Sequence, residues 1–405
     1  MILPILFFIF FPFLAFVYSL SDIRKPALAF IFIAFYALFG YCNHFELISA
    51  DIARIGYKFQ TIYNASNAFD LYTEGDRPDL YSMLLFYYLS PFTSNPKILC
   101  AFIGLIYGVL SYAVFVNVYK FWPSTRSFSF YLYVLIVICN ISLVHMTGVR
   151  FFTGGLLFLL SSLNFIKGKR LWAIGALIPC FIHFSLLIAS GAFIAYLLFG
   201  QLFKSKILSV IFLLIALGIS FVDLGRFAAG YIDMMDIENQ ALEVKINAYT
   251  APEVSAIEHE QTAYRAANIL FTTIFNIISK IGLILSLIIL INKTNFKTLP
   301  VFTRHLFLFT IVLSISALLS LTLTETAMRF INLAWCSLLV LFPLLINQLQ
   351  LNIKSWIYSF AFFNFYSISY LFFNAPRMVT PDLWYAPLPL LIYEGLNFRI
   401  TWFVI

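Results

Sequence analysis

Long apolar stretches separated by short polar breaks run from the first residue of the chain to beyond residue 370. A helix needs roughly 20 mostly apolar residues to cross a bilayer, and these stretches approach that length. We therefore expect an all-α polytopic membrane protein with about eleven or twelve transmembrane segments. The expected spans are 2–20, 27–42, 98–119, 127–145, 150–166, 171–199, 207–222, 269–291, 305–322, 329–347 and 355–373.

Two of these stretches differ from a typical single span. Residues 1–20 lack the basic start and the small-residue cleavage site of a signal peptide, so they are expected to be the first span. The stretch 171–199 is too long for one span and is interrupted between His183 and Gly191. Two short segments that meet near the outer surface fit better, because the basic breaks on both sides then share a compartment.

Composition excludes a set of soluble domains. Hydrophobic residues make up 62% of the chain, charged residues 11%, and the mean hydropathy is +0.94, so we expect one integral membrane domain over 1–405. The net charge of +7 would suggest nucleic acid for a soluble protein, but no nucleic-acid partner is expected here. The five cysteines have no CxxC spacing, which argues against a disulfide framework or a zinc site. No cofactor and no metal are expected.

The distribution of charge predicts the orientation, because short loops rich in Lys and Arg remain cytoplasmic. One register places inside the cell the residues Arg24, Lys25, Lys120, Arg126, Lys167, Lys169, Arg170, Lys204, Lys206, Lys293, Lys297, Arg304 and Lys354. Asp22 is then the only acidic residue on that side. Since the rule is scored on basic residues, the acidic partition is a partly independent check. Both chain ends are external in this register.

Three external segments follow from this register: 43–97, 223–268 and the carboxy-terminal tail 374–405. The first contains an apolar patch, Leu80–Phe92, which is too short to cross and is expected to form a re-entrant or interfacial helix. The second is rich in Asp and Glu and is long enough to hold helices of its own and cover a site.

Charged side chains near the hydrocarbon are costly, so they are functional candidates. Arg150 opens a span and is followed by Gly154 and Gly155, where another backbone or a ligand can approach. His183 lies inside an apolar run, and Lys280 lies within a span. Each has a structural alternative: Arg150 as an interface anchor, His183 as a core histidine bonded to a carbonyl, and Lys280 as a cavity residue.

A second pair of candidates precedes a late span. Glu325 and Arg329 are four residues apart and share one face of a helix. One alternative is that they pair with each other, and Arg329 alone has the alternative of an interface anchor.

The first external segment contains Asp51 and Arg54, which lie three apart and can share a helical face, followed by Tyr57. Glu74 and Asp76 have a spacing that holds a divalent cation in some membrane glycosyltransferases, but a solvated turn explains them better. The sequence contains no HExxH, GxSxG, Walker A or GxGxxG motif, which argues against a nucleotide site of the soluble type.

Together these residues resemble the signature of the EpsG and Wzy-type bacterial polysaccharide polymerases. In that family an Arg opens a span, a basic turn ends it, and a His-x-Ser follows within the next. Here the matching stretches are 150–163, 167–170 and 183–185. Asp51-x-x-Arg54 and Arg329-Phe330 are two further matches. The family often has Tyr or His directly after the first Arg, whereas Ile55 stands there in this chain and the aromatic residue is delayed to Tyr57.

The resemblance implies a GT-C-like helical bundle in the bacterial inner membrane, with its active site facing the periplasm or the cell exterior. It implies transfer of a growing glycan from undecaprenyl diphosphate to the terminal sugar of an incoming lipid-linked repeat unit. Expected partners are undecaprenyl-diphosphate-linked oligosaccharides, membrane lipids and, as a candidate, a chain-length regulator protein.

The implied chemistry assigns roles to the candidate residues. Arginines would stabilise the leaving diphosphate, because their planar fork binds phosphate oxygens bidentately. The expected substrate-binding residues are Arg54, Arg150, Arg329 and Tyr57, and the candidate bases for the acceptor hydroxyl are Asp51, Glu325 and His183, in that order. A carboxylate in a partly dry cleft would have a raised pKa suited to that work.

Two other readings stay open. An O-antigen ligase-type glycan transferase uses the same lipid-linked donor with another acceptor, but it typically has one large external loop late in the chain. A transporter or flippase for the lipid-linked unit is expected to carry charges along a path through the membrane and to show internal repeats. This chain shows no such repeat, and its charges gather at one face, with Lys280 as the exception.

Overall fold

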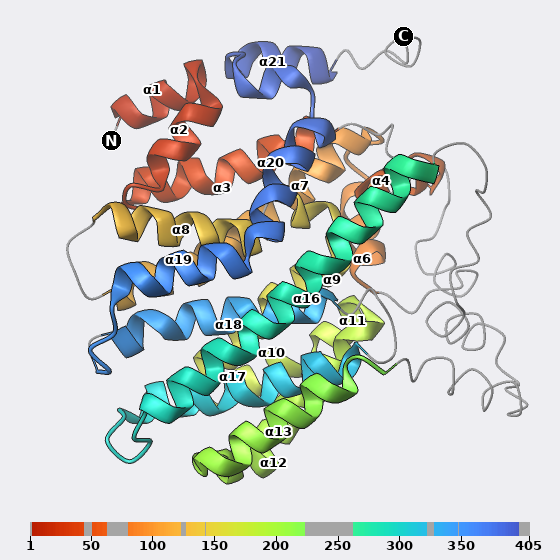
Figure 1. Ribbon diagram of the computed structural model, residues 1–405. Helices are drawn as coiled ribbons and strands as arrows, with labels where there is room; N and C mark the ends of the chain where they lie inside the picture. The colour runs from red at the N-terminus through yellow and green to blue at the C-terminus, as the bar shows by residue number, and fades with distance from the viewer. Residues whose placement is uncertain are drawn as a thin grey trace, which may run out of the picture. The chain divides into compact units, whose positions relative to one another are not determined.

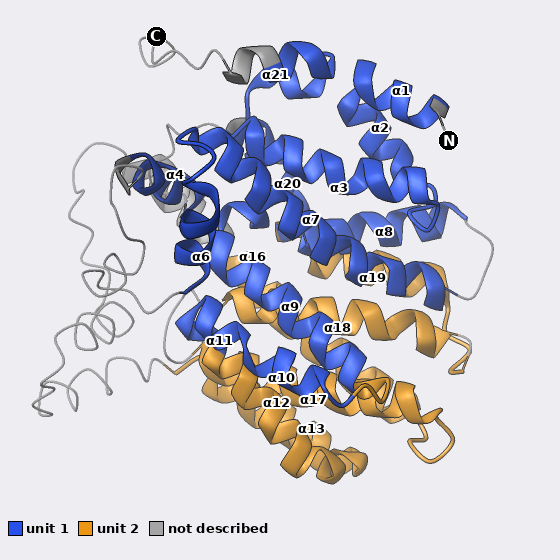
Figure 2. Cartoon of the chain, turned by 180° about the vertical axis from the view of Figure 1, so that it is seen from behind, with its two compact units in different colours: residues 1–165, 170–186, 367–405 blue, residues 166–169, 187–366 orange. Residues whose placement is uncertain are grey.

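The computed structural model describes residues 2–43, 51–62, 80–122, 127–141, 143–222, 262–321, 328–346 and 348–396. All secondary-structure elements in these ranges are helices, and one isolated bridge joins Asn43 to Val379. The chain divides into two compact units, coloured separately in Figure 2. Unit 1 comprises residues 1–165, 170–186 and 367–405, and unit 2 comprises 166–169 and 187–366.

Unit 1 contains the amino-terminal helices and the carboxy-terminal ones (Figure 1). Its elements are α1 (Ile2–Phe10), α2 (Pro12–Ser19), α3 (Pro26–Tyr41), α4 (Asp51–Ile62), α6 (Leu80–Leu89), α7 (Pro96–Phe121), α8 (Phe128–Asn140), η1 (His145–Thr147), α9 (Val149–Ile166), α10 (Trp172–Leu177), α11 (Pro179–Ile182), η2 (Phe184–Leu186), α20 (Phe365–Met378), η5 (Pro381–Trp384) and α21 (Leu388–Leu396). The last residue of α9 and the first two of α20 belong to unit 2. Unit 2 contains α12 (Leu187–Phe199), η3 (Gly200–Lys204), α13 (Lys206–Ile219), α16 (Thr262–Lys293), α17 (Val301–Ser320), α18 (Met328–Ile346) and α19 (Ile353–Phe363).

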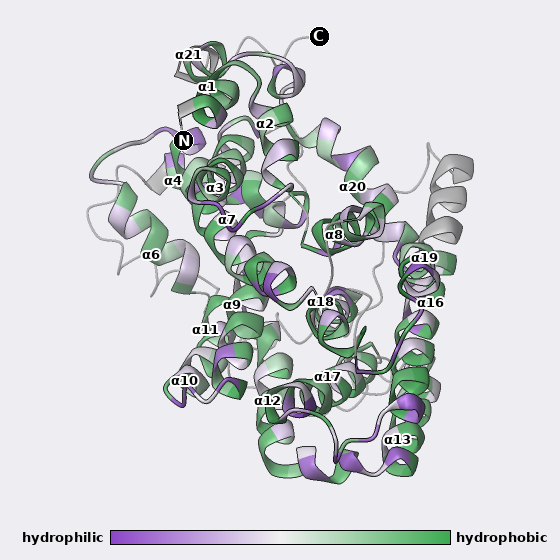
Figure 3. Cartoon of the chain, turned by 90° about the vertical axis from the view of Figure 1, so that its left-hand side faces the viewer, coloured by the Kyte–Doolittle hydropathy of each residue, from purple (hydrophilic) through white to green (hydrophobic). Residues whose placement is uncertain are grey.

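The protein is an all-α polytopic membrane protein. Within the described residues, 7 helical segments are long and apolar enough to cross a bilayer: Pro96–Phe121, Phe128–Thr147, Val149–Ile166, Phe184–Lys204, Thr273–Lys293, Val301–Ser320 and Met328–Ile346. Figure 3 shows hydrophobic residues along most of the helices and hydrophilic ones gathered in the connecting turns. Every one of these segments overlaps a span expected from the sequence.

The other expected spans are shorter or divided. Residues 2–20 form α1 and α2, because Phe11 leaves helical geometry (φ −139°, ψ 70°) directly before Pro12, which has no N–H to donate. Residues 355–373 are divided at Asn364, where α19 ends. The expected spans 27–42 and 207–222 correspond to helices of 16 and 14 residues. The length criterion is therefore met by fewer segments than the sequence predicts.

Close backbone packing organises unit 1 around α3 and α7. A Cβ at Gly40 would overlap the Cys100 carbonyl, and one at Gly104 would overlap the Tyr36 carbonyl. Glycine at these positions lets the two helices approach along their length, as small residues do in membrane helix pairs. Around this contact, Phe16 stacks on Phe35 with ring centroids 4.4 Å apart. The result is a closely packed helix pair at the centre of unit 1.

Unit 2 is organised around α17, which packs against α12, α13, α16 and α18. Two buried polar contacts tie its helices together: Thr310 Oγ1 lies 2.8 Å from Ser337 Oγ, and Trp335 Nε1 donates to Ser279 Oγ at 3.0 Å. These pairs satisfy polar atoms that would otherwise be costly inside an apolar bundle.

Within each unit, contacts join polar breaks that carry Lys or Arg residues. In unit 2, Lys206 Nζ donates to the Asn292 carbonyl at 2.8 Å, and Lys167 Nζ lies 5.7 Å from the centroid of the Phe302 ring. In unit 1, the Tyr119 hydroxyl donates to the Leu20 carbonyl. These contacts agree with the charge-based register, in which the breaks that they join share a compartment.

Candidate functional site

The candidate site begins at α4, which lies in the segment expected to be the first external loop. Ile52, Ala53 and Ile55 are buried, and α4 packs against α7 and η1. Asp51 lies in the first turn of the helix, where the positive end of the helix dipole favours a carboxylate. Arg54 follows one turn later, and its side chain is half-exposed. The packed face thus fixes Asp51 while Arg54 reaches toward solvent.

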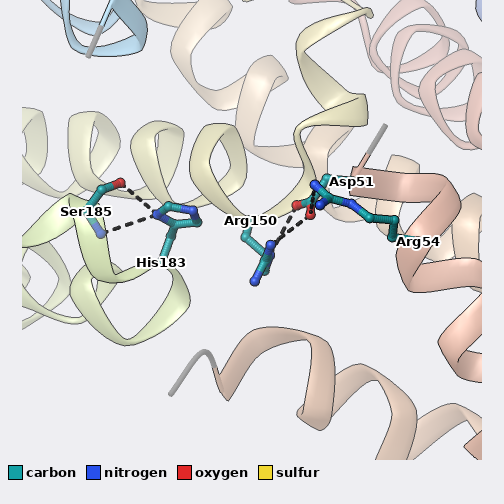
Figure 4. A network of polar contacts seen from close by, with 5 residues as sticks. All are labelled: Asp51, Arg54, Arg150, His183 and Ser185. Atoms are coloured by element: carbon teal, nitrogen blue, oxygen red, sulfur yellow. Dashed lines mark hydrogen bonds and ion pairs between the residues drawn. The ribbon is translucent and has the colours of Figure 1, made fainter. Parts of the chain in front are cut away.

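Arg150 reaches Asp51 from the first turn of α9 (Figure 4). Its Nη2 donates to Asp51 Oδ1 at 2.7 Å, and its Nε donates to Asp51 Oδ2 at 3.1 Å. The exposed fractions of the two side chains are only 10% and 15%. Arg54 Nη2 also reaches Asp51 Oδ1, at 3.5 Å. The arrangement is a bidentate, mostly buried ion pair with a second guanidinium at its edge.

The pKa of Asp51 reflects this environment. Burial acts to raise the pKa of the carboxyl, but the hydrogen bonds and charge of Arg150 act in the opposite direction, helped by the charge of Arg54. The net pKa of Asp51 is lowered. The raised pKa that the sequence suggested for a carboxylate in a dry cleft is therefore wrong for Asp51 in this state, because the cleft contains guanidinium groups.

His183 lies where the long apolar stretch 171–199 is interrupted. Helix α11 ends there, and the His183 backbone is extended (φ −150°, ψ 123°) before η2 begins. The Ser185 backbone N–H donates to His183 Nδ1 at 3.3 Å, and Ser185 Oγ lies 2.7 Å from the same nitrogen. Because a backbone N–H can only donate, Nδ1 acts as an acceptor, which assigns the ring proton of the neutral imidazole to Nε2. His183 therefore offers an N–H donor at Nε2.

Gly154 brings the His183 turn against α9. A Cβ at this position would overlap Leu186 Cδ1 and would lie 3.3 Å from Ile182 Cγ2. These two residues flank the His183 turn in the sequence. The sequence suggested that another backbone or a ligand approaches a glycine one turn after Arg150; at Gly154 the structure places the side chains of Leu186 and Ile182 there instead.

The structure brings Asp51, Arg54, Arg150 and His183 together within unit 1. Tyr57 is exposed on α4, one turn beyond Arg54. Arg329 lies at the start of α18 in unit 2 and is half-buried. Glu325 lies outside the described residues.

Lys280 Nζ lies 5.4 Å from the centroid of the Phe221 ring, within unit 2, which is a structural environment for a lysine in a span. Two buried hydroxyls of unit 1, on Tyr81 and Thr153, were not singled out from the sequence. The available signal was the spacing of Thr153, which is three residues after Arg150 and shares its helical face.

The site is suited to binding an anion that carries several acceptor oxygens. The guanidinium groups of Arg150 and Arg54 contact one carboxylate, and His183 lies nearby (Figure 4), so an incoming phosphate would meet several N–H donors. Among the described residues, no group of three or more His, Cys, Asp or Glu side chains is placed to hold a metal ion. Comparison of the chain with protein-family models, curated proteins and solved structures finds no match.

Proposed function

We propose that the protein is a polymerase of lipid-linked oligosaccharide repeat units. It transfers a growing glycan from undecaprenyl diphosphate to the terminal sugar of an incoming undecaprenyl-diphosphate-linked repeat. One observation carries the proposal: residues from two distant segments meet in the bidentate pair of Arg150 with Asp51. Both belong to the motifs on which the resemblance to the EpsG and Wzy-type polymerases rests. Arg54 and His183, from the same motifs, lie beside the pair.

In the proposed reaction, an acceptor hydroxyl oxygen attacks the anomeric carbon of the donor glycan. The bond from that carbon to the diphosphate oxygen breaks, and the diphosphate leaves with the electron pair. Charge gathers on the diphosphate as the bond breaks, so fixed guanidinium groups stabilise the transition state more than the ground state. Arg150 and Arg54 supply this stabilisation in the described cluster, and Arg329 is a further candidate.

Asp51 has two successive roles in this proposal. Before the donor binds, its carboxylate holds the Arg150 guanidinium in position. An arriving diphosphate competes with Asp51 for the same N–H groups, and withdrawal of Arg150 removes the main influence that lowers the pKa of Asp51. The carboxylate then becomes a stronger acceptor for the proton of the attacking hydroxyl. Glu325 stays the second candidate base, and the assigned tautomer of His183 favours a donor role for that residue.

The proposed reaction takes place at the outer face of the membrane. The protein lies in a bacterial inner membrane as a GT-C-like bundle with about eleven or twelve crossings. The Asp51 and Arg150 pair faces the periplasm or the cell exterior. The one-sided distribution of basic residues supports this orientation.

Deletion of the gene, followed by gel analysis of the surface glycan, tests the proposal. Loss of a polymerase leaves single capped repeats, loss of a ligase leaves no glycan on the final acceptor, and loss of a flippase strands units on the inner leaflet. We expect single repeats. Either of the other two patterns would reject the proposed function in favour of the corresponding alternative.

Complementation of the deletion assigns the arginines. Arg150→Ala and Arg329→Ala are expected to abolish polymer at unchanged protein level, because each removes a guanidinium proposed to bind the diphosphate. Arg24→Ala is the matched control, since Arg24 is a half-exposed arginine paired with Asp22 away from the motif residues. Full-length polymer from either variant would remove that residue from the proposed machinery.

A further inference from the structure

Two buried hydroxyls lie next to the Arg150 cluster. Thr153 is 2% exposed on α9, and the Tyr81 hydroxyl adjoins it from α6. Neither hydroxyl has a hydrogen bond of full geometry with any other described residue, and the two lie close enough to share one contact with each other. Two hydroxyls that share one contact still leave one O–H without an acceptor. A buried donor in that state costs about 1–3 kcal/mol, so it is rare in native proteins and calls for an explanation. A ligand that accepts hydrogen bonds at this point provides one.

The position of the two hydroxyls relative to Arg150 indicates which part of a ligand they meet. Thr153 follows Arg150 by three residues, so it lies on the same face of α9 and about 4.5 Å further along the axis. Arg150 opens the helix, and Thr153 therefore lies toward the middle of the span. Helix α6, which carries Tyr81, packs against both α4 and α11, the helices next to Asp51 and His183.

A prenyl diphosphate has matching geometry. Its prenyl chain must enter the hydrocarbon and its glycan must remain in water, so its two phosphates follow one another along the membrane normal. We propose that the Thr153 and Tyr81 hydroxyls bind the lipid-proximal phosphate of a prenyl diphosphate, while Arg150 binds the sugar-proximal phosphate. This inference rests on the proposed function and adds to it that the site selects diphosphate over monophosphate carriers.

The chemistry of the residues supports this division. Hydroxyl groups donate to phosphate oxygens without adding charge, so they hold the lipid-proximal phosphate without competing with the guanidinium groups for the leaving negative charge. A prenyl monophosphate reaches only one of the two subsites. It binds either to the arginines or to the hydroxyls, and it makes no contact with the other subsite.

Binding measurements on the full-length protein in detergent test the proposal. The probes are farnesyl diphosphate and farnesyl monophosphate, titrated by calorimetry. The wild-type protein is expected to bind the diphosphate at least about tenfold more tightly, since one hydrogen bond to a charged group corresponds to about that factor. The double variant Thr153→Val with Tyr81→Phe is expected to lose this preference, with the affinity for the monophosphate changed less than about twofold.

Ser162→Ala is the matched control. Ser162 also lies on α9, is fully buried, and has a hydroxyl without a partner among the described residues, but it is three turns away from Arg150. It is expected to leave both affinities unchanged. The proposal is overturned if the double variant keeps the preference for diphosphate, if it loses both probes equally, or if the wild type shows no preference.

The same titration keeps this inference apart from the proposed function, which is judged by the glycan pattern of the deletion strain. A strain that accumulates single repeats, together with a protein that binds both probes equally, would keep the polymerase and reject the hydroxyl subsite. A preference for diphosphate that depends on the two hydroxyls, without a polymerase pattern, would keep the subsite and reject the polymerase.

Discussion

The ion pair between Asp51 and Arg150 makes a quantitative prediction about stability. In Asp51→Asn the side chain keeps its shape but loses its charge, so Arg150 remains about nine-tenths buried beside a neutral amide. Removing one partner of a buried pair leaves an uncompensated charge and costs about 3 kcal/mol. For a unit of this size, that corresponds to a fall in Tm on the order of 5–10 °C.

A second ion pair in the same unit provides the control. Arg24 Nε lies 2.9 Å from Asp22 Oδ1, but the Arg24 side chain is 48% exposed. Solvent screens such a pair, so Asp22→Asn is expected to cost no more than about 1 kcal/mol. The two variants make the same chemical change at similar distances and differ in the burial of the arginine.

The assay is thermal unfolding of the purified protein in detergent, followed by intrinsic fluorescence. A double-mutant cycle with Arg150→Gln isolates the coupling between the two side chains. We expect a coupling of about 2 kcal/mol or more for Asp51 with Arg150. Equal shifts in Tm for Asp51→Asn and Asp22→Asn, or a coupling below about 0.5 kcal/mol, would refute the argument that burial makes this pair strong.

The stability that the Asp51 carboxylate contributes depends on pH, because the pKa of Asp51 is lowered in the folded protein. A carboxyl whose pKa is lower in the folded state contributes stability above its unfolded pKa, near 3.8, and loses it as the pH falls through the folded value. The gap in Tm between wild type and Asp51→Asn should therefore be constant from about pH 8 to about pH 5 and should narrow below about pH 4. A gap that widens in acid would contradict the assignment.

Two further variants test the geometry around the pair. If His183 acts through its Nε2–H, His183→Gln, which places an amide N–H near that position, should keep more polymer-forming activity than His183→Asn; equal loss in both would favour a base role. Gly154→Ala should lower the Tm and the activity together, because a Cβ overlaps the residues that flank the His183 turn, at a cost of about 1–3 kcal/mol. Gly191→Ala is its control, since nothing lies within 4 Å of a Cβ on this helical glycine, and it should be neutral or slightly stabilising; a similar loss of Tm in both would show that the effect of Gly154→Ala is not local.

Much of the architecture was predictable because the insertion of a segment into the membrane depends on the summed transfer free energies of its own residues. Each apolar residue contributes to the transfer of its own segment into the bilayer, so a run of sufficient length identifies a helix without knowledge of its neighbours. The interruption of 171–199 was predictable for the same reason, and the structure places it at His183. Division of 2–20 at Phe11 depends on one backbone conformation beside Pro12, which a hydropathy sum over the segment does not contain.

The candidate site was predictable in its members but not in its chemistry. Asp51, Arg54, Arg150 and His183 stand out in the sequence because a charged or polar group near hydrocarbon needs a reason. Their relation depends on how α4 and α9 are held in unit 1, since Asp51 and Arg150 are 99 positions apart. Only the folded structure shows that Asp51, the expected base, pairs with Arg150, an arginine expected to bind phosphate. The same pairing lowers the pKa of Asp51.

The hydroxyls of Tyr81 and Thr153, in contrast, could not be identified as site residues from the sequence. Serine, threonine and tyrosine are common in membrane helices and ordinarily find a partner, so neither residue is conspicuous in the sequence. By itself, the sequence determined the helical membrane class, the one-sided charge and the residues to examine, because these follow from the local free energy of transfer. The tertiary structure alone decided which of those residues touch and which buried hydroxyls lie beside the Arg150 pair, because contacts between distant segments depend on packing.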